Sequence, residues 1–159
     1  MSRAQDFAEQ YAFHTSLIQN HIEGVTDTES LLQPPFDANC MNWVLGHIIS
    51  RRQSSLEALG SEPLWGEQRI RIYITGSDPI TSADRAVSFR TLREALQHSN
   101  ERLRAALEHA SAEQLEQLVV NDRGEKSAAE HLEGFLWHET YHIGQLDLLQ
   151  SFINSTRHA

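Results

Sequence analysis

Apolar residues recur at three- and four-residue steps in four long segments, and this periodicity restricts the fold more than any other feature of the chain. Such steps place side chains on one face of a helix, whereas a half-buried strand alternates residue by residue. The predicted helices cover residues 7–21, about 39–60, about 82–107 and 127 to about 153. We therefore expect an all-α four-helix bundle in one domain, residues 1–159, with a frayed tail at 154–159.

The connections between these segments are marked by helix-breaking and capping residues. Pro34-Pro35 separates the first two helices, because proline cannot continue a helix and pushes the residue before it to an extended conformation. Residues 61–81 form a long connection that carries Trp65 and Tyr73. Its stretch 69–75 alternates like a strand but has no evident partner strand, so we predict a long ordered loop. Capping boxes at 111–114 and 127–130 predict a short extra turn and the start of the last helix.

Composition excludes several classes of protein. The formal net charge is −9, and the basic residues are scattered, so nucleic acid is not an expected partner. No apolar run approaches the length of a membrane span, and the N-terminus does not resemble a signal peptide. The single cysteine, Cys40, cannot form an intramolecular disulfide. These features predict a soluble cytoplasmic protein without a membrane partner.

A histidine pair in the last helix is the strongest chemical signal. His138 and His142 are spaced i, i+4, so both imidazoles lie on one helix face and can reach the same metal ion. Such a site needs a third ligand to hold a tetrahedral ion and keep one position open. His47 lies on an apolar face of the second helix, where an unpaired ring would cost about 1–3 kcal/mol. The three histidines form a candidate metal site.

The other histidines and the cysteine have simpler interpretations. His98, His109 and His158 are expected at the surface or in satisfied positions. His131 is seven residues before His138, about 10.5 Å along the helix, and is too far away to share its ion. His14 and His21 lie on the inward stripe of the first helix, where hydrogen-bonded core positions are favoured over support of a ligand. Cys40 is expected in the core.

The sequence His138-Glu139-Thr140-Tyr141-His142 also matches the His-Glu-x-x-His motif of zinc proteases. In that motif the glutamate polarises a metal-bound water. Only 17 residues follow His142, and they contain neither a glutamate nor a histidine before His158. A sheet that could bind a peptide backbone is also missing from the predicted fold. A protease is therefore a minor alternative.

Several segments resemble the DinB-like (DinB/YfiT) family of four-helix-bundle metalloproteins: Asn42-Trp43-Val44-Leu45-Gly46-His47, 138–145, Trp65 and 76–80. The resemblance implies a metal bound by His47, His138 and His142, an open position for water or substrate, and frequent homodimers. The ion would be a divalent transition metal such as zinc, nickel or iron. Characterised relatives include S-transferases and isomerases that use bacillithiol or mycothiol. A low-molecular-weight thiol is thus the expected cosubstrate.

Two further residues are candidates for supporting roles at this site. Gln145 lies three residues beyond His142 and can hold a ligand or a water, although packing in the bundle is an equal alternative. Glu139 is a general base or, as we favour, a carboxylate that orients another group. The expected function is metal-assisted activation of a small thiol for S-transfer or isomerisation. A metal-dependent hydrolase and a non-catalytic metal- or ligand-binding stress protein are the alternatives.

Overall fold

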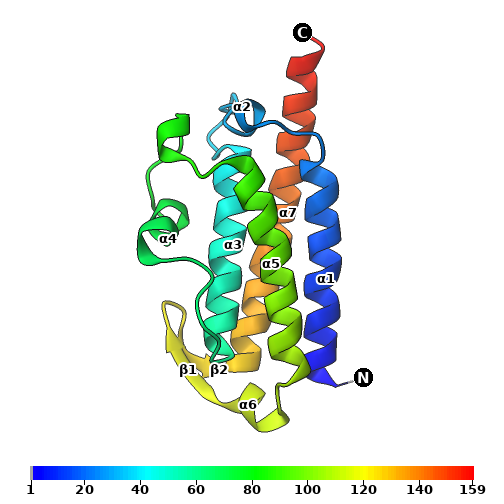
Figure 1. Ribbon diagram of the computed structural model, residues 1–159, viewed down its shortest axis with the longest axis vertical. Coiled ribbons are helices and arrows are strands. Elements are labelled where there is room, and N and C mark those ends of the chain that lie inside the picture. Colours follow the sequence, from blue (N-terminus) through cyan, green and yellow to red (C-terminus); the bar gives the residue numbers. More distant parts are fainter. Residues whose placement is uncertain (1) are drawn as a thin grey trace.

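The computed structural model describes residues 2–159 and confirms the predicted all-α bundle (Figure 1). Its four long helices are α1 (Arg3–Ile22), α3 (Met41–Ala58), α5 (Phe89–Glu108) and α7 (Ala128–Arg157). The shorter elements are α2 (Asp27–Ser30), α4 (Glu67–Tyr73), the 3₁₀ helix η1 (Ala83–Arg85), α6 (Ala112–Glu116), β1 (Leu118–Asn121) and β2 (Gly124–Ser127).

The four long helices do not simply alternate in direction. In Figure 1, α1 and α7 run upward and α3 and α5 run downward, so α3 and α5 are parallel neighbours. α3 packs antiparallel against α7, and α1 packs antiparallel against α5. A chain that leaves α3 at the bottom must return to the top before α5 begins. An 18-residue helix is about 27 Å long, and this distance explains the long crossover connection, residues 59–88.

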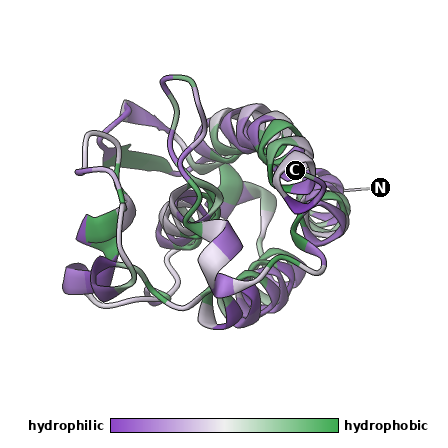
Figure 2. Cartoon of the chain, turned by 90° about the horizontal axis from the view of Figure 1, so that it is seen from above, coloured by the Kyte–Doolittle hydropathy of each residue, from purple (hydrophilic) through white to green (hydrophobic). Residues whose placement is uncertain are grey.

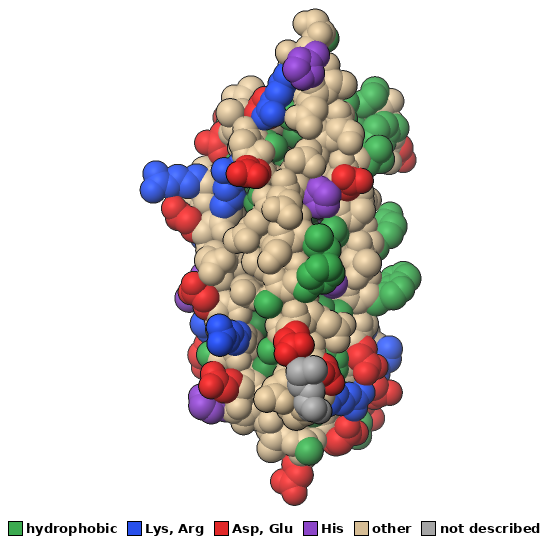
Figure 3. Space-filling view, turned by 90° about the vertical axis from the view of Figure 1, so that its right-hand side faces the viewer, with side chains coloured by type: hydrophobic (Ala, Val, Ile, Leu, Met, Phe, Trp, Pro, Cys, Tyr) green, Lys and Arg blue, Asp and Glu red, His purple; other side chains and the backbone are tan. Residues whose placement is uncertain are grey.

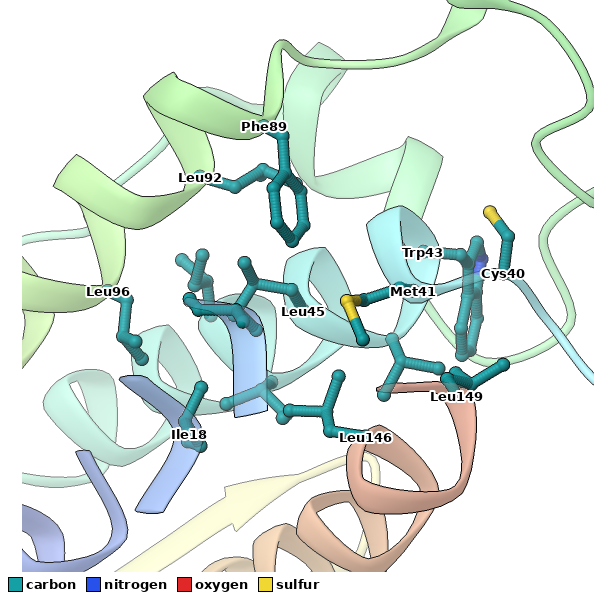
Figure 4. Packing of buried hydrophobic residues seen from close by; sticks show 14 of the residues in the cluster. Ile18, Cys40, Met41, Trp43, Leu45, Phe89, Leu92, Leu96, Leu146 and Leu149 are labelled. Atoms are coloured by element: carbon teal, nitrogen blue, oxygen red, sulfur yellow. The ribbon is translucent and has the colours of Figure 1, made fainter. Parts of the chain in front are cut away.

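Two buried apolar clusters fill the bundle. Seen along the bundle axis, hydrophilic residues dominate the outward sides of the helices (Figure 2). The upper cluster joins α3 to α5 and α7 (Figure 4); its members include Ile18, Met41, Leu45, Phe89, Leu92, Leu96, Leu146 and Leu149. The lower cluster includes Phe7, Tyr11, Leu56, Leu103, Leu107, Leu132 and Leu136. Residues of several helices thus contribute to both clusters, as expected for a bundle core.

The crossover connection differs from the predicted loop. Residues 67–73 form the helix α4 rather than an irregular segment, and the strand-like alternation of 69–75 does not correspond to a strand. Tyr73, at the end of α4, is fully buried, and Trp65 is also buried. The third long helix begins at Phe89 instead of near Ser82, because Ser88 caps it by accepting a hydrogen bond from Thr91 N–H.

A β-hairpin precedes the last helix, in a region where the residues Asn121-Asp122-Arg123-Gly124 by themselves indicate only a turn. β1 and β2 pair antiparallel, with Asn121 opposite Gly124. Gly124 has a φ of +92°, a conformation that favours glycine. The predicted capping box then starts α7, because Ser127 and Glu130 exchange side chain-to-backbone hydrogen bonds. α7 continues to Arg157, beyond the expected end near Ile153, and Arg157 binds Glu29.

The surface carries both signs of charge. Acidic and basic side chains are interspersed on the face seen in Figure 3, with groups of hydrophobic side chains between them. Within residues 2–159, none of the helices combines the length and the apolar character needed to cross a bilayer.

Candidate metal centre

The structure brings His47, His138 and His142 together between the antiparallel helices α3 and α7. One potential ligand atom from each residue lies within 4.8 Å of the others. The Nε2 atom of His138 is 3.0 Å from that of His47 and 2.9 Å from that of His142. Nitrogen ligands about 2.0–2.1 Å from a tetrahedral ion lie about 3.3 Å apart, so a small adjustment accommodates a zinc-like ion.

Neighbouring groups fix the orientation of the His47 ring. Its Nδ1 atom is 2.7 Å from the carbonyl oxygen of Tyr73, which can only accept a hydrogen bond, so Nδ1 carries the proton. The unprotonated Nε2 atom then faces the other two histidines. The Trp43 ring stacks on His47 with 4.7 Å between the ring centroids, and the Trp43 indole N–H donates to Ser77 of the crossover. The crossover therefore orients a ring that is carried by α3.

His142 is oriented in the same manner by a residue of its own helix. Its Nδ1–H donates to the side-chain oxygen of Gln145 at 2.6 Å, which leaves Nε2 free to face the cluster. Gln145 in turn donates to the hydroxyl group of Tyr141 at 3.4 Å. In many metal sites, a hydrogen bond of this kind at the second ring nitrogen sets the tautomer and position of the ligand. The geometry thus places Gln145 beside the cluster.

Burial keeps the three imidazoles neutral, the form that binds metal. Desolvation lowers the pKa of His47 to about 3 and that of His138 to about 4, and it also lowers the pKa of His142. His47 and His142 are buried, whereas His138 is only partly buried, so one side of the cluster approaches the surface. Three neutral nitrogen donors suit a divalent transition metal such as zinc. The residues present fit such an ion.

Glu139 points away from the histidine cluster into the bundle. Its carboxylate accepts hydrogen bonds from the Arg52 guanidinium at 2.7 and 3.0 Å and lies 3.3 Å from Nδ1 of His14. Burial would raise the pKa of Glu139, but the charge of Arg52 and the neighbouring His14 hold it below its usual value. Arg52 also donates to Thr15 and Ser99. These contacts form a buried polar layer beside the metal centre.

Sequence reasoning did not identify Arg52 or Gly46. Arginine is a residue type that favours the surface, yet Arg52 is fully buried. Only its place within an apolar helical pattern could have indicated that its side chain is buried. Gly46 contacts the ring of Tyr73 so closely that a Cβ atom there would overlap the ring. A glycine within a long helical pattern is a signal for such close packing.

The remaining histidines lie outside the cluster. His131 is buried and hydrogen bonds to the Val119 carbonyl oxygen and to Asn121. His14 faces Glu139 and Thr140, and His21 contacts Gln150. Cys40 is buried at the start of α3, and burial raises the pKa of its thiol. None of these four side chains belongs to the three-histidine cluster.

Comparison with known proteins places this fold and site in context. A crystal structure described as the conserved protein of locus from Enterococcus faecalis superposes with a TM-score of 0.75, covering 98% of this chain and 99% of that chain. The sequence identity is 17%, so the likeness concerns the fold. No curated protein matches the chain significantly. The sequence profile of the DinB superfamily matches residues 10–146, a range that contains all three clustered histidines. The chain therefore belongs to the DinB superfamily.

Proposed function

We propose that the protein binds one divalent transition metal through His47, His138 and His142 and uses it to activate a small thiol for S-transfer or isomerisation. The observation that carries this proposal is the convergence of three Nε2 atoms, at separations of 2.9 and 3.0 Å. Three lone pairs so close together are unfavourable unless a proton or a cation lies between them. A bound cation lowers the pKa of a coordinated thiol or water, which is the chemistry that the ion would supply.

The residues around the cluster have distinct proposed roles. The carbonyl oxygen of Tyr73 holds His47 in the tautomer that directs Nε2 toward the cluster. The side chain of Gln145 does the same for His142. Trp43 covers one face of His47 and shields it from water. Glu139 positions Arg52 and is not directed toward the cluster, which favours a supporting role over that of a general base. The same orientation weakens the protease-like alternative, in which a glutamate must reach the metal-bound water.

Metal analysis of protein purified without chelators or immobilised metal tests the first part of this proposal. We expect one zinc, nickel or iron ion per chain in the wild-type protein. The second part is tested by loading the protein with Co²⁺ and adding 2-mercaptoethanol, because thiolate coordination to cobalt produces a distinct near-ultraviolet absorption band. A spectrum that thiols leave unchanged, together with hydrolysis of activated esters, would favour the hydrolase alternative. A metal-dependent gain in stability without any reactivity would favour the non-catalytic binding protein.

We also propose that two chains associate through the outer face of α7. Trp137, Tyr141 and Leu148 lie at i, i+4 and i+11, on one stripe of the helix, and are 74, 57 and 55% exposed. Gly144 lies on the same stripe, has open space around it, and would allow a second helix to approach closely. Sedimentation at micromolar concentration tests this association. A particle of one chain's mass, 18.1 kDa, over that range would exclude it.

A further inference from the structure

Two arginines from different elements, Arg51 and Arg123, lie near the histidine cluster. Arg51 follows His47 by one turn of α3. Arg123, at the tip of the hairpin, donates to the carbonyl oxygen of Gly134 at 3.1 Å, and Gly134 precedes His138 by one turn of α7. A separation of four residues corresponds to about 6 Å along a helix axis. Because α3 and α7 are antiparallel, Arg51 and Gly134 lie toward the same end of the bundle from the histidines. The charge of Arg51 acts on all three histidines, and that of Arg123 acts on His138.

Contacts with the protein hold both guanidinium groups in place. Arg51 binds the Asp122 carboxylate through Nη1 at 2.8 Å and the Thr75 hydroxyl through Nη2 at 3.3 Å. Arg123 lies over the Phe135 ring, 4.8 Å from its centroid. The Nε atom of Arg51 is buried and has no hydrogen-bond partner among the described residues. One donor of this pair thus has its hydrogen-bonding capacity unused.

The local charge is positive although the chain carries a net charge of −9. Arg51 and Arg123 face one carboxylate, that of Asp122, and together the three groups carry one positive charge. Burial and the neighbouring charge of Arg51 lower the pKa of Arg123. The nearby Glu139 does not offset this charge, because it is already paired with Arg52. Two guanidinium groups beside a cation site repel each other and the ion, and an anionic ligand would relieve this repulsion.

We propose that the small molecule accepted by the metal centre carries an anionic oxygen group, a carboxylate or a phosphate, which Arg51 and Arg123 bind. This inference rests on the proposed thiol chemistry and specifies its substrate class. The fork of N–H groups on each guanidinium matches the oxygens of either anion. Arg51 and Gly134, which binds Arg123, each lie about 6 Å along a helix axis from a histidine of the cluster. This spacing suits a compact thiol acid, whose thiol reaches the cluster while its acid group reaches the arginines.

The test compares three thiols on the Co²⁺-loaded protein: mercaptosuccinate, which has two carboxylates, neutral 2-mercaptoethanol and cationic cysteamine. The change in the cobalt absorption gives a dissociation constant for each. For Arg51→Gln and Arg123→Gln we expect the constant for mercaptosuccinate to rise about 10- to 100-fold, the range for losing a charge-assisted hydrogen bond. The constant for 2-mercaptoethanol should change by no more than about twofold, because a neutral thiol does not use these groups.

Matched variants control for charge and folding. Arg90→Gln removes one positive charge from α5, where Arg90 pairs with the exposed Glu94, and should leave all three constants unchanged. If Arg51→Gln does not fold, Arg51→Lys keeps the charge but loses the fork, and it should weaken mercaptosuccinate binding several-fold. Equal losses for mercaptosuccinate and 2-mercaptoethanol, or no loss for either, would overturn the anion subsite while leaving the thiol function intact.

Simple anions separate this inference from the proposed function. If no thiol changes the cobalt spectrum, the thiol function fails, and calorimetry with succinate and inorganic phosphate on the metal-loaded protein still decides the anion subsite. Binding of either anion that is weakened by Arg51→Gln supports the subsite, and the tighter anion identifies a carboxylate or a phosphoryl group. Binding that Arg51→Gln does not change, or no binding at millimolar concentration, overturns it.

Discussion

The buried pair of Arg52 and Glu139 offers a sharp test of the polar layer. Arg52 is 0% and Glu139 3% exposed, and the two side chains share two hydrogen bonds. Glu139→Gln preserves the size of the side chain but removes its charge and turns an amide group toward the guanidinium. Removing one partner of a buried ion pair leaves an uncompensated charge and costs about 3–5 kcal/mol of unfolding free energy. We expect a loss in this range, a large fraction of the total stability of a domain.

Urea unfolding followed by circular dichroism measures this loss in metal-free protein. Glu133→Gln on the same helix is the matched control, because the pair of Glu133 with Arg3 is exposed and such pairs contribute about 0–1 kcal/mol. The double variant Arg52→Met with Glu139→Leu should be more stable than Glu139→Gln, since it removes both charges together. A Glu139→Gln variant within about 1 kcal/mol of wild type would refute the interpretation of this pair as a buried, mutually dependent unit.

Metal content gives a second readout for the same variant. Because the Glu139 carboxylate faces Arg52 and not the histidines, folded Glu139→Gln protein should keep its full metal stoichiometry. In a protease-like site the corresponding glutamate lies beside the metal-bound water, and its loss abolishes hydrolysis without unfolding the protein. Wild-type stability combined with altered reactivity would therefore point to the hydrolase alternative.

Four other outcomes are expected. His47→Ala should remove most of the bound metal in elemental analysis, because three-ligand binding is cooperative, whereas His131→Ala should not. In metal-free protein kept in chelator, the urea midpoint of unfolding should fall as the pH drops below about 6.5. The pKa of His47 is about 3 in the folded state, so the unfolded chain binds one proton more than the folded chain in this range. The free energy of unfolding therefore falls by about 1.4 kcal/mol per pH unit. Gly46→Ala should cost about 1–3 kcal/mol by displacing Tyr73, and should weaken metal binding in a competition assay with a chelator. Ser127→Ala should cost about 1 kcal/mol in urea unfolding, through loss of the cap of α7.

Periodicity predicted the four long helices because each one buries a continuous apolar stripe. It could not predict their directions, since a stripe looks the same whichever way the helix runs. α4 was missed for a related reason: seven residues make only two turns, and the alternation of Arg69, Ile70, Arg71 and Ile72 outweighed the helical signal. The hairpin was missed because strands of four residues with little buried surface leave a weak pattern.

The three-histidine cluster followed from the i, i+4 spacing of one pair and the apolar setting of the third residue. The groups that orient the rings were only partly predictable. Gln145 could be placed by its helical spacing, but the partner of His47 is a backbone carbonyl group, that of Tyr73, which carries no side-chain signal. The burial of Arg52 could not be inferred from its residue type, because arginine is almost never fully buried unless it is paired.

Two connections of the bundle, the crossover and the segment with the hairpin, converge on the histidine cluster, and this convergence connects fold to chemistry. The crossover supplies the Tyr73 carbonyl oxygen that fixes the tautomer of His47, and Tyr73 is itself held by hydrogen bonds of its hydroxyl group to Asn42 and Val87. The hairpin supplies Asp122, which holds Arg51. The helices alone carry the histidines, but the hydrogen bonds that select one tautomer of His47 and fix Arg51 come from these connections. The affinity for metal and the choice of ligand should therefore respond to changes in the connections as well as in the helices.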